Sequence, residues 1–242
     1  MLIYQYELNT YHKKHTMIDA LSISLSSKEI VAFVGGGGKS SVIKKISNEL
    51  KDLKKKVIIT TTTHIYMPEK NVVLEENLDR IQLELDKNNI VTVGIPCGNQ
   101  KLKAVSDLFL AKLADLCDVL LIEADGSKHM PIKAPADHEP VIPPYATLVV
   151  GVAGLDCLGK PIGDISHRPE LLANILNKKT DDMLIPKDVA IILEHANGQK
   201  KNVTGRYEII LNKADNERLL NEALSVASFL TSKKCIISSL LK

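Results

Sequence analysis

The chain alternates short runs of apolar residues with longer stretches in which apolar residues recur every three or four positions. A short apolar run is typical of a strand, and the longer spacing is typical of a helix with one buried face. The apolar runs predict strands at Ile30–Val34, Val57–Thr60, Val72–Leu74, Ile90–Ile95, Val119–Ile122, Thr147–Val152, Glu208–Leu211 and Cys235–Ser238. The spaced stretches predict helices at Lys39–Lys51, Asn77–Lys87, Val105–Leu116, Arg168–Leu176, Asp188–Glu194 and Asn216–Leu230.

This alternation of strands and helices predicts an α/β fold built on a doubly wound, mainly parallel sheet. Val119–Ile122 is apolar at every position, which is typical of a central strand buried on both faces. Residues 1–29 are expected to be a preamble to the sheet, with a helix and a short strand and no residue of a site. Pro131–Pro144 is too rich in proline for regular structure. Because ligands of such sheets bind at the carboxyl ends of the strands, the polar residues at those ends are the candidates for a site.

The first candidate is the stretch from Gly35 to Ser41, where an apolar strand meets four glycines and a Lys-Ser pair that opens a helix. Glycines allow a tight turn whose backbone N–H groups point at an anion. The helix N-terminus adds partial positive charge, Lys39 adds a full charge, and Ser40 offers a hydroxyl for Mg²⁺. We therefore predict a P-loop in which Lys39 is an exposed catalytic residue. The predicted nucleotide-binding residues of this loop are Gly35, Gly36, Gly37, Gly38, Lys39, Ser40 and Ser41.

The spacing of this loop is shorter than the usual one. The G-x-x-x-x-G-K-[ST] pattern needs glycine at position 33, which is Phe33 here, so the chain has G-x-x-G-K-S instead. The alternative interpretation is a flexible glycine turn between a strand and a helix. A Lys-Ser pair at the start of the helix adds nothing to such a turn, and this favours the phosphate-binding interpretation.

A second candidate, Glu123-Ala124-Asp125-Gly126, follows the buried strand. Carboxylates at this point can hold Mg²⁺ directly or through water, opposite the Ser40 hydroxyl. We predict a metal site of Ser40, Glu123 and Asp125, with Asp125 also catalytic, and a Gly126 N–H that approaches a terminal phosphate. The alternative is that the acidic side chains merely leave the strand for solvent.

Asn212-Lys213-Ala214-Asp215 matches the N-K-x-D pattern of GTP-binding proteins. One carboxylate can accept from both N1–H and the N2 amino group of guanine, whereas adenine has an acceptor at N1 and no N2 amino group. Asp215 is therefore predicted to read guanine, Lys213 to cover the ring, and Asn212 to reach the base or brace the glycine loop. The alternative is a chance tetrapeptide.

Three weaker clusters also contain polar side chains. Thr60-Thr61-Thr62-Thr63-His64 could ligate metal or position a water, with Thr62 chosen as the catalytic residue, although β-branched residues also suit a strand end. The clusters Lys128–Lys133 and Asp137–Pro140 could bind an anionic substrate or a second metal, or form a rigid surface loop.

Composition narrows the class of protein. The formal net charge is +2 and 45% of the residues are apolar, which favours a sizeable core and gives no indication of nucleic-acid or membrane binding. The four cysteines are widely spaced without a C-x-x-C pair, and the N-terminus lacks a signal-peptide pattern, so we expect a cytoplasmic protein. Cys97 and Cys157 lie in glycine-containing loops, where most cysteines are unreactive.

Together the motifs resemble those of the YqeC family over nearly the whole chain, from about residue 18 to residue 240. The matching segments are Gly35–Ser41, Thr60–His64, Glu123–Ser127, Lys133–Pro135, His138–Pro140 and Asn212–Asp215. Proteins of that family are described as accessory factors of selenium-dependent molybdenum hydroxylases, proposed to help make or insert a labile selenium cofactor. The resemblance thus implies a role in maturation, with a hydroxylase or its cofactor as a partner.

Two further resemblances disagree about the base of the nucleotide. The short glycine loop is similar to that of Mur-type ligases, which use ATP, whereas E-x-x-G with N-K-x-D resembles the nucleotide-dependent metallochaperone GTPases. We predict a Mg²⁺-dependent P-loop hydrolase, with GTP favoured over ATP, formed by a single nucleotide-binding domain over residues 1–242. The alternatives are a ligase or small-molecule kinase that uses ATP, and a nucleotide-switched binding protein or metallochaperone.

Overall fold

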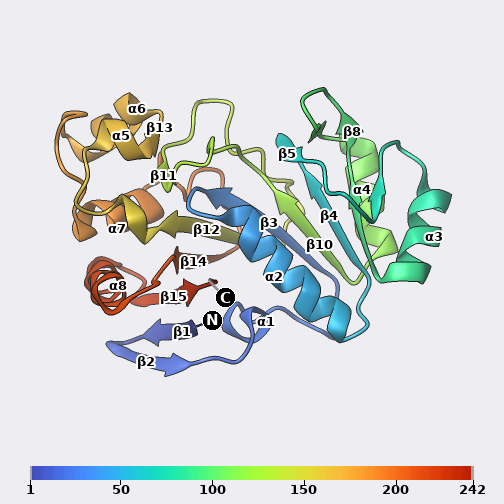
Figure 1. The fold of residues 1–242 in the computed structure, drawn as a ribbon, viewed down its shortest axis with the longest axis horizontal. Helices are drawn as coiled ribbons and strands as arrows, with labels where there is room; N and C mark the ends of the chain where they lie inside the picture. The colour runs from blue at the N-terminus through green and yellow to red at the C-terminus, as the bar shows by residue number, and fades with distance from the viewer. Residues whose placement is uncertain (1, 241–242) are drawn as a thin grey trace.

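In the computed structural model, which describes residues 2–240, ten strands form one sheet through the middle of the molecule (Figure 1). Eight neighbouring strands, from β15 to β6, are parallel, and two antiparallel strands extend one edge. In spatial order they are β2 (Thr10–Lys13), β1 (Leu2–Glu7), β15 (Lys234–Ser239), β14 (Arg206–Asn212), β12 (Leu148–Gly154), β3 (Glu29–Gly35), β10 (Val119–Glu123), β4 (Val57–Thr61), β7 (Ile90–Val93) and β6 (Val72–Val73). The predicted mainly parallel sheet is confirmed, with β10 as a central strand between β3 and β4.

Helices cover both faces of this sheet because successive side chains of a strand point to opposite faces. Val31 and Phe33 of β3 belong to the core under α1 and α2, whereas Leu120 and Ile122 of β10 belong to the core under α3 and α4. The fold is therefore doubly wound, as predicted. The helices are α1 (Met17–Ala20), α2 (Lys39–Asp52), α3 (Leu78–Asn88), α4 (Asp107–Leu116), α5 (Ile162–Ile165), α6 (Pro169–Leu176), α7 (Pro186–Glu194) and α8 (Glu217–Phe229), with a 3-10 turn at Leu155–Cys157.

Residues 2–13 form a hairpin on the edge of the sheet rather than a separate preamble. Strand β1 pairs with β15 over six residues, and β2 pairs with β1. Ile3 and Tyr6 of β1 are buried, but all four residues of β2 are exposed. A strand without a buried face has no apolar pattern, and this is why the sequence does not predict the hairpin.

Two small sheets stand apart from the main one. Strands β5 (His64–Tyr66), β9 (Lys101–Lys103) and β8 (Ile95–Pro96) form an antiparallel sheet beyond the ends of β4 and β7. Strands β11 (Ile132–Lys133) and β13 (Ser166–His167) form a parallel pair. The proline-rich stretch thus contains a strand, contrary to expectation, but its two residues are too few to produce a pattern.

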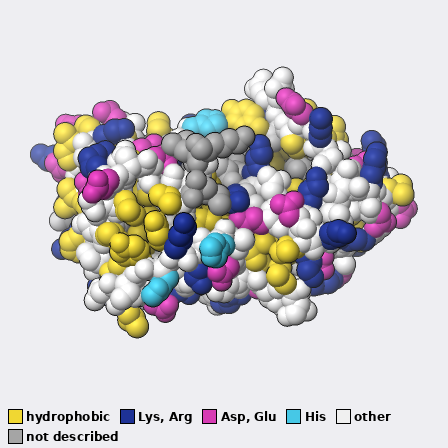
Figure 2. Space-filling view, turned by 60° about the horizontal axis from the view of Figure 1, so that its bottom comes forward, with side chains coloured by type: hydrophobic (Ala, Val, Ile, Leu, Met, Phe, Trp, Pro, Cys, Tyr) yellow, Lys and Arg dark blue, Asp and Glu magenta, His cyan; other side chains and the backbone are white. Residues whose placement is uncertain are grey.

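No helix within residues 2–240 is both long enough and apolar enough to cross a membrane. On the face shown in Figure 2, acidic and basic side chains are interspersed without a large patch of one sign, in keeping with the net charge of +2.

Candidate functional site

The glycine loop joins the carboxyl end of β3 to the start of α2, as the sequence predicts. Gly37 and Gly38 have φ angles of 74° and 112°, which residues other than glycine rarely adopt. A Cβ atom on Gly37 would also lie 2.0 Å from the backbone nitrogen of Gly154, at the end of the neighbouring strand β12. Glycine is therefore required here both for the turn and for close packing against the next strand.

The loop uses some of its N–H groups internally and leaves others free. The N–H groups of the first three glycines donate to Asp125 and to two backbone carbonyls of neighbouring segments. Within residues 2–240, the N–H groups of Gly38, Lys39 and Ser40 donate to no acceptor, and α2 has no side-chain cap. Free N–H groups at the positive end of a helix dipole form an anion site.

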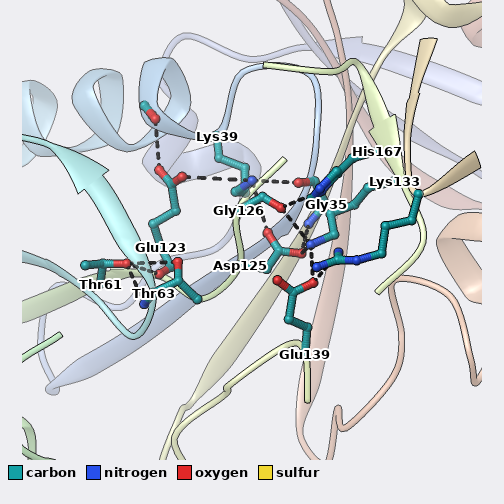
Figure 3. Close-up of polar contacts among 12 residues, drawn as sticks. Gly35, Lys39, Thr61, Thr63, Glu123, Asp125, Gly126, Lys133, Glu139 and His167 are labelled. Atoms are coloured by element: carbon teal, nitrogen blue, oxygen red, sulfur yellow. Dashed lines mark hydrogen bonds and ion pairs between the residues drawn. The ribbon is translucent and has the colours of Figure 1, made fainter. Parts of the chain in front are cut away.

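Lys39 is buried, which corrects the expectation of an exposed loop lysine: only 3% of the residue is accessible. Its ammonium donates to the Gly35 carbonyl at 2.6 Å and lies 3.0 Å from Oδ1 of Asp125 (Figure 3). Glu123 Oε1 is 4.0 Å away. Asp125 and Glu123, at the carboxyl end of β10, thus attract the Lys39 ammonium. The aliphatic part of the lysine side chain is long enough to fold back over the loop and reach them.

Glu123 ends strand β10 opposite the start of α2. The Ser40 hydroxyl donates to its Oε2 at 2.8 Å. Burial raises the pKa of Glu123, while the charge of Lys39 and the hydrogen bond from Ser40 oppose that rise. A buried carboxylate with an adjacent hydroxyl suits Mg²⁺, which takes one or two carboxylates plus phosphate oxygens rather than a full protein cage. No cluster of three or more potential metal-binding His, Cys, Asp or Glu occurs within the described residues.

Asp125 is surrounded by donors. Its Oδ2 accepts from Gly35 N–H at 2.9 Å and lies 3.3 Å from the Lys133 ammonium, and its Oδ1 faces Lys39. The sequence predicts Asp125 as a metal ligand and catalytic group. The structure brings it to the loop, but among cations and an N–H group, where it holds the glycine loop and Lys39 in position.

A chain of alternating charges extends from Asp125 to α6. Lys133 is completely buried and donates to Glu139 at 2.6 Å and to the Gly126 carbonyl at 2.7 Å. Arg168 donates to the same Glu139 oxygen at 2.6 Å. Burial works to raise the pKa of Glu139, but the hydrogen bonds and charges of Lys133 and Arg168 outweigh it and lower the pKa to about 2. These charges form a fixed network beside the loop.

The N-K-x-D segment lies at the carboxyl ends of β14 and β15. Asn212 is buried and donates to the Gly37 carbonyl at 2.8 Å, so it braces the glycine loop, one of the two predicted roles. Lys213 lines the cleft over the loop and pairs with Asp156 at 2.7 Å. Asp215 is exposed, and its Oδ1 accepts from the Ser239 hydroxyl at 2.6 Å.

The threonine run lies beside Glu123 but makes mostly backbone contacts. The Thr61 hydroxyl donates to the Glu123 carbonyl, and the Thr62 hydroxyl donates to the Val141 carbonyl, both at 2.8 Å. Thr63 lines the cleft, whereas Thr62, the residue chosen from sequence, does not. The run therefore secures the end of β4 against β10.

A cleft of about 710 Å³ opens over the loop. Lys39, Ser40 and Glu123 line it from the main sheet, and Tyr66 and Lys101 line it from the small antiparallel sheet. The exposed Cys97 also lines this cleft, whereas Cys157 is completely buried, and burial raises the pKa of its thiol.

Several residues of the site are absent from the sequence predictions, among them His167 and Arg168. His167 lines the cleft, and Arg168 ends the charge network. They precede Pro169 at the start of α6, and the sequence there indicates only the start of a helix. A His-Arg pair just before a helix was the available signal, but nothing in the sequence relates it to a loop far earlier in the chain.

Comparison with known proteins agrees with the motifs. The family model described as YqeC protein matches residues 31–170. A protein of Escherichia coli strain K12 described as uncharacterized protein YqeC is 31% identical in an alignment of 194 positions that covers 76% of this chain and 76% of that protein. Among solved structures, the septum site-determining protein MinD of Pyrococcus horikoshii OT3, complexed with Mg-ADP, aligns with a TM-score of 0.41 and 14% identity, over 84% of this chain and 78% of that one. Because the family match spans more than half of the 242 residues, the chain belongs to the YqeC family.

Proposed function

We propose that this protein binds a nucleoside triphosphate with Mg²⁺ in the cleft and hydrolyses it, and that it prefers GTP to ATP. One observation carries the proposal: within residues 2–240, three N–H groups at the start of α2 donate to no acceptor, and one of these residues, Lys39, also has a buried ammonium. A buried ammonium needs an anionic partner, and here it uses Asp125 and a backbone carbonyl. Phosphate oxygens would take over these contacts when a nucleotide binds.

Ser40 and Glu123 are the residues that would hold Mg²⁺. Their oxygen atoms are 2.8 Å apart, and binding a cation would relieve the cost of ionising the buried Glu123. When bound, Mg²⁺ neutralises charge on the phosphate oxygens during phosphoryl transfer. We assign Asp125 the task of positioning Lys39 and the loop, and we assign Thr62 no catalytic role.

The preference for guanine rests on Asp215. The Ser239 hydroxyl orients this carboxylate from one side, through Oδ1, and Oδ2 makes no hydrogen bond within the described residues. The hydrogen bond from Asn212 to the Gly37 carbonyl holds the N-K-x-D segment beside the glycine loop. This proximity supports the proposal that a single ligand contacts both. Two hydrogen bonds to a charged acceptor contribute about 1.5–3 kcal/mol each before compensation by water. A preference of at least roughly tenfold, or about 1.4 kcal/mol, is the expected result.

The test is calorimetric titration of the protein with GTP and ATP in the presence and absence of Mg²⁺. Lys39→Ala should abolish binding of both nucleotides, because their phosphates lose the buried cation. Lys112→Ala, on the exposed face of α4, is the matched control and should bind as the wild type does. Equal binding by Lys39→Ala and the wild type would overturn the proposal.

Asp215→Asn tests the base separately. Its amide can donate to the C2 carbonyl of xanthine where the carboxylate accepted from guanine. The variant should therefore lose affinity for GTP, gain affinity for XTP, and keep its affinity for ATP. If the wild type binds ATP and GTP equally, or if the variant keeps the guanine preference, the N-K-x-D match is a coincidence and ATP is the better candidate.

A second candidate is transfer of the terminal phosphate to an anionic acceptor. Lys101 and Lys128 line the cleft, and neither forms an ion pair within residues 2–240. These two cations favour a small carboxylate or phosphate ester as the acceptor. Phosphate release in the absence of any acceptor favours hydrolysis, whereas nucleotide binding without turnover favours a switch.

We also propose, from membership of the YqeC family, that the activity serves maturation of a selenium-dependent molybdenum hydroxylase. The resemblance of the motifs is the support for this role. Cells that lack the protein should contain the hydroxylase in inactive form, and Lys39→Ala should fail to restore it. Normal hydroxylase activity in such cells would contradict the role without affecting the nucleotide site.

A further inference from the structure

His167 is fixed beside the glycine loop by the smallest sheet of the molecule. Strand β13 pairs with β11 so that His167 stands opposite Lys133 in the register. Both side chains reach the carbonyl of Gly126, Lys133 through Nζ at 2.7 Å and His167 through Nδ1 at 3.1 Å (Figure 3). Gly126 in turn directly follows Asp125, which contacts the loop itself.

The contact with Gly126 determines which nitrogen of the ring carries the proton. A backbone carbonyl only accepts hydrogen bonds, so Nδ1 of His167 must be the donor. In the neutral ring, Nε2 then has a free lone pair. Since His167 lines the same cleft as Lys39 and Ser40, this lone pair belongs to a residue of the nucleotide site.

The surroundings also favour the neutral ring. Burial, together with the charges of Arg168 and Lys133, lowers the pKa of His167 from its usual 6.5, while the hydrogen bond to Gly126 and the charge of Glu139 oppose this. Glu139 opposes it only weakly, because both cations are hydrogen bonded to the same carboxylate. At neutral pH the ring is therefore a base with its tautomer already set.

Three other candidate bases of the cleft are engaged elsewhere, and a fourth, His64, lies in β5 on the wall formed by the small antiparallel sheet. Glu139 is paired with Lys133 and Arg168, and the low pKa that results makes it a weak base. Glu123 is committed to Ser40. The ring of His129 stacks on Tyr66 with centroids 5.6 Å apart, at the wall formed by the small antiparallel sheet.

We propose that His167 is a catalytic residue in which Nε2 accepts a proton from the water that attacks the terminal phosphate. The inference rests on the proposed nucleotide hydrolysis. An O–H bond of water breaks and its proton moves to Nε2, while the oxygen forms a bond to phosphorus. The bond from phosphorus to the bridging oxygen breaks, and its electron pair leaves with the nucleoside diphosphate. The imidazolium then returns its proton to solvent.

The decisive variant is His167→Asn. The asparagine Nδ2 can occupy the position of the histidine Nδ1 and keep the hydrogen bond to Gly126, but it leaves no base at the position of Nε2. We expect kcat for GTP hydrolysis to fall by about 10²–10⁴-fold, the usual contribution of a general base, with nucleotide affinity within about twofold of wild type. His12→Asn on the exposed strand β2 is the matched control and should leave both quantities unchanged.

The pH dependence of kcat/KM separates a base from a structural residue. A base acts only when neutral, so the wild-type value should rise with pH through a pKa below 6.5 and then level off. His167→Asn should lack this rise and keep only the dependence that comes from ionisation of the nucleotide. Wild-type turnover and an unchanged profile in His167→Asn would show that His167 only holds Gly126, and would overturn the inference.

Failure of the inference differs from failure of the proposed function. If the wild type does not bind nucleotide, the proposed function itself is wrong. If it binds nucleotide and does not turn it over, the hydrolytic step and the role of His167 are both wrong, and the nucleotide site stands.

Discussion

Two glycines of the site, Gly37 and Gly126, differ in whether the fold itself requires a glycine at that position. Gly37 has a positive φ angle, and a Cβ there would overlap Gly154, so the fold itself excludes a side chain. Gly126 has neither constraint: the space beside its Cα is open, and it lines the cleft. The fold does not need this glycine, and the sequence predicts contact with a terminal phosphate at this point, so we predict that the phosphate of a bound nucleotide fills the open space.

Gly126→Ala should therefore separate binding from folding. The methyl group meets no protein atom, so the free energy of unfolding should change by less than about 0.5 kcal/mol. It should weaken binding of GTP roughly tenfold more than binding of GDP, because only GTP has a phosphate at that position. Urea unfolding and calorimetric titration measure the two effects.

Gly37→Ala is the contrasting variant. It should lower the free energy of unfolding by at least about 2 kcal/mol, since both the backbone conformation and the packing against Gly154 are strained. For Gly126→Ala, by contrast, the decisive quantity is binding affinity. Equal losses of affinity for GTP and GDP in that variant would argue against a phosphate beside Gly126.

At the scale of elements, sequence reasoning succeeded where a pattern is long enough to repeat. The eight predicted strands and six predicted helices all occur, with ends that differ by two residues at most. The elements it missed are the β1–β2 hairpin, in which β2 has no buried face, the 3-10 turn, the one-turn helix α5, and the short strands β5, β8, β9, β11 and β13. Strands of two or three residues owe their existence to tertiary pairing, and β11 and β13 are the ones that hold Lys133 and His167.

The charge network that these short strands hold should be visible in the acid stability of the protein. In the folded state the pKa of Glu139 is about 2, against an ordinary value of 4.5. A carboxyl group whose pKa is lowered on folding stabilises the protein above its unfolded pKa and loses that effect as pH falls. The stabilisation, about 3 kcal/mol at neutral pH, should therefore disappear as pH falls from about 5 to about 2.

Urea unfolding at a series of pH values checks this expectation. The difference in free energy of unfolding between wild type and Glu139→Gln should shrink as pH falls through that interval, because the variant has no carboxyl group to titrate. Glu75→Gln removes an exposed carboxylate that also pairs with an arginine, and its difference from wild type should stay small throughout. A difference for Glu139→Gln that is constant with pH would mean that the network does not depend on the charge of Glu139.

At the scale of the whole molecule, the site is assembled at the carboxyl ends of β3, β10, β4 and β14. These strands are predictable, and so are the polar residues that follow them, because parallel strands present their carboxyl ends at one edge. The far side of the cleft comes from the small sheets and from the residues before α6. Their position depends on how the connections fold over the sheet edge, which no local pattern in the sequence specifies.

This arrangement predicts that nucleotide binding changes the rate of hydrogen exchange in segments beyond the glycine loop. Asp125 contacts Gly35 and Lys133 through Oδ2 and Lys39 through Oδ1. When phosphate oxygens take over Lys39, Asp125 is left to Gly35 and Lys133, and these remaining contacts should become stronger. Hydrogen exchange measured by mass spectrometry should therefore slow on GTP binding at residues 35–41 and also at residues 124–139 and 166–168.

Asp125→Asn should break this link, because the amide keeps the size of the side chain but loses the charge that attracts both lysines. The variant should retain protection at residues 35–41 when GTP is present and lose most of it at residues 131–133 and 166–168. Helix α3, which shares no hydrogen bond or ion pair with the network within the described residues, serves as the internal reference and should exchange at the same rate in every state. If GTP protects only residues 35–41 in the wild type, the charge network is a structural support with no part in the response to nucleotide.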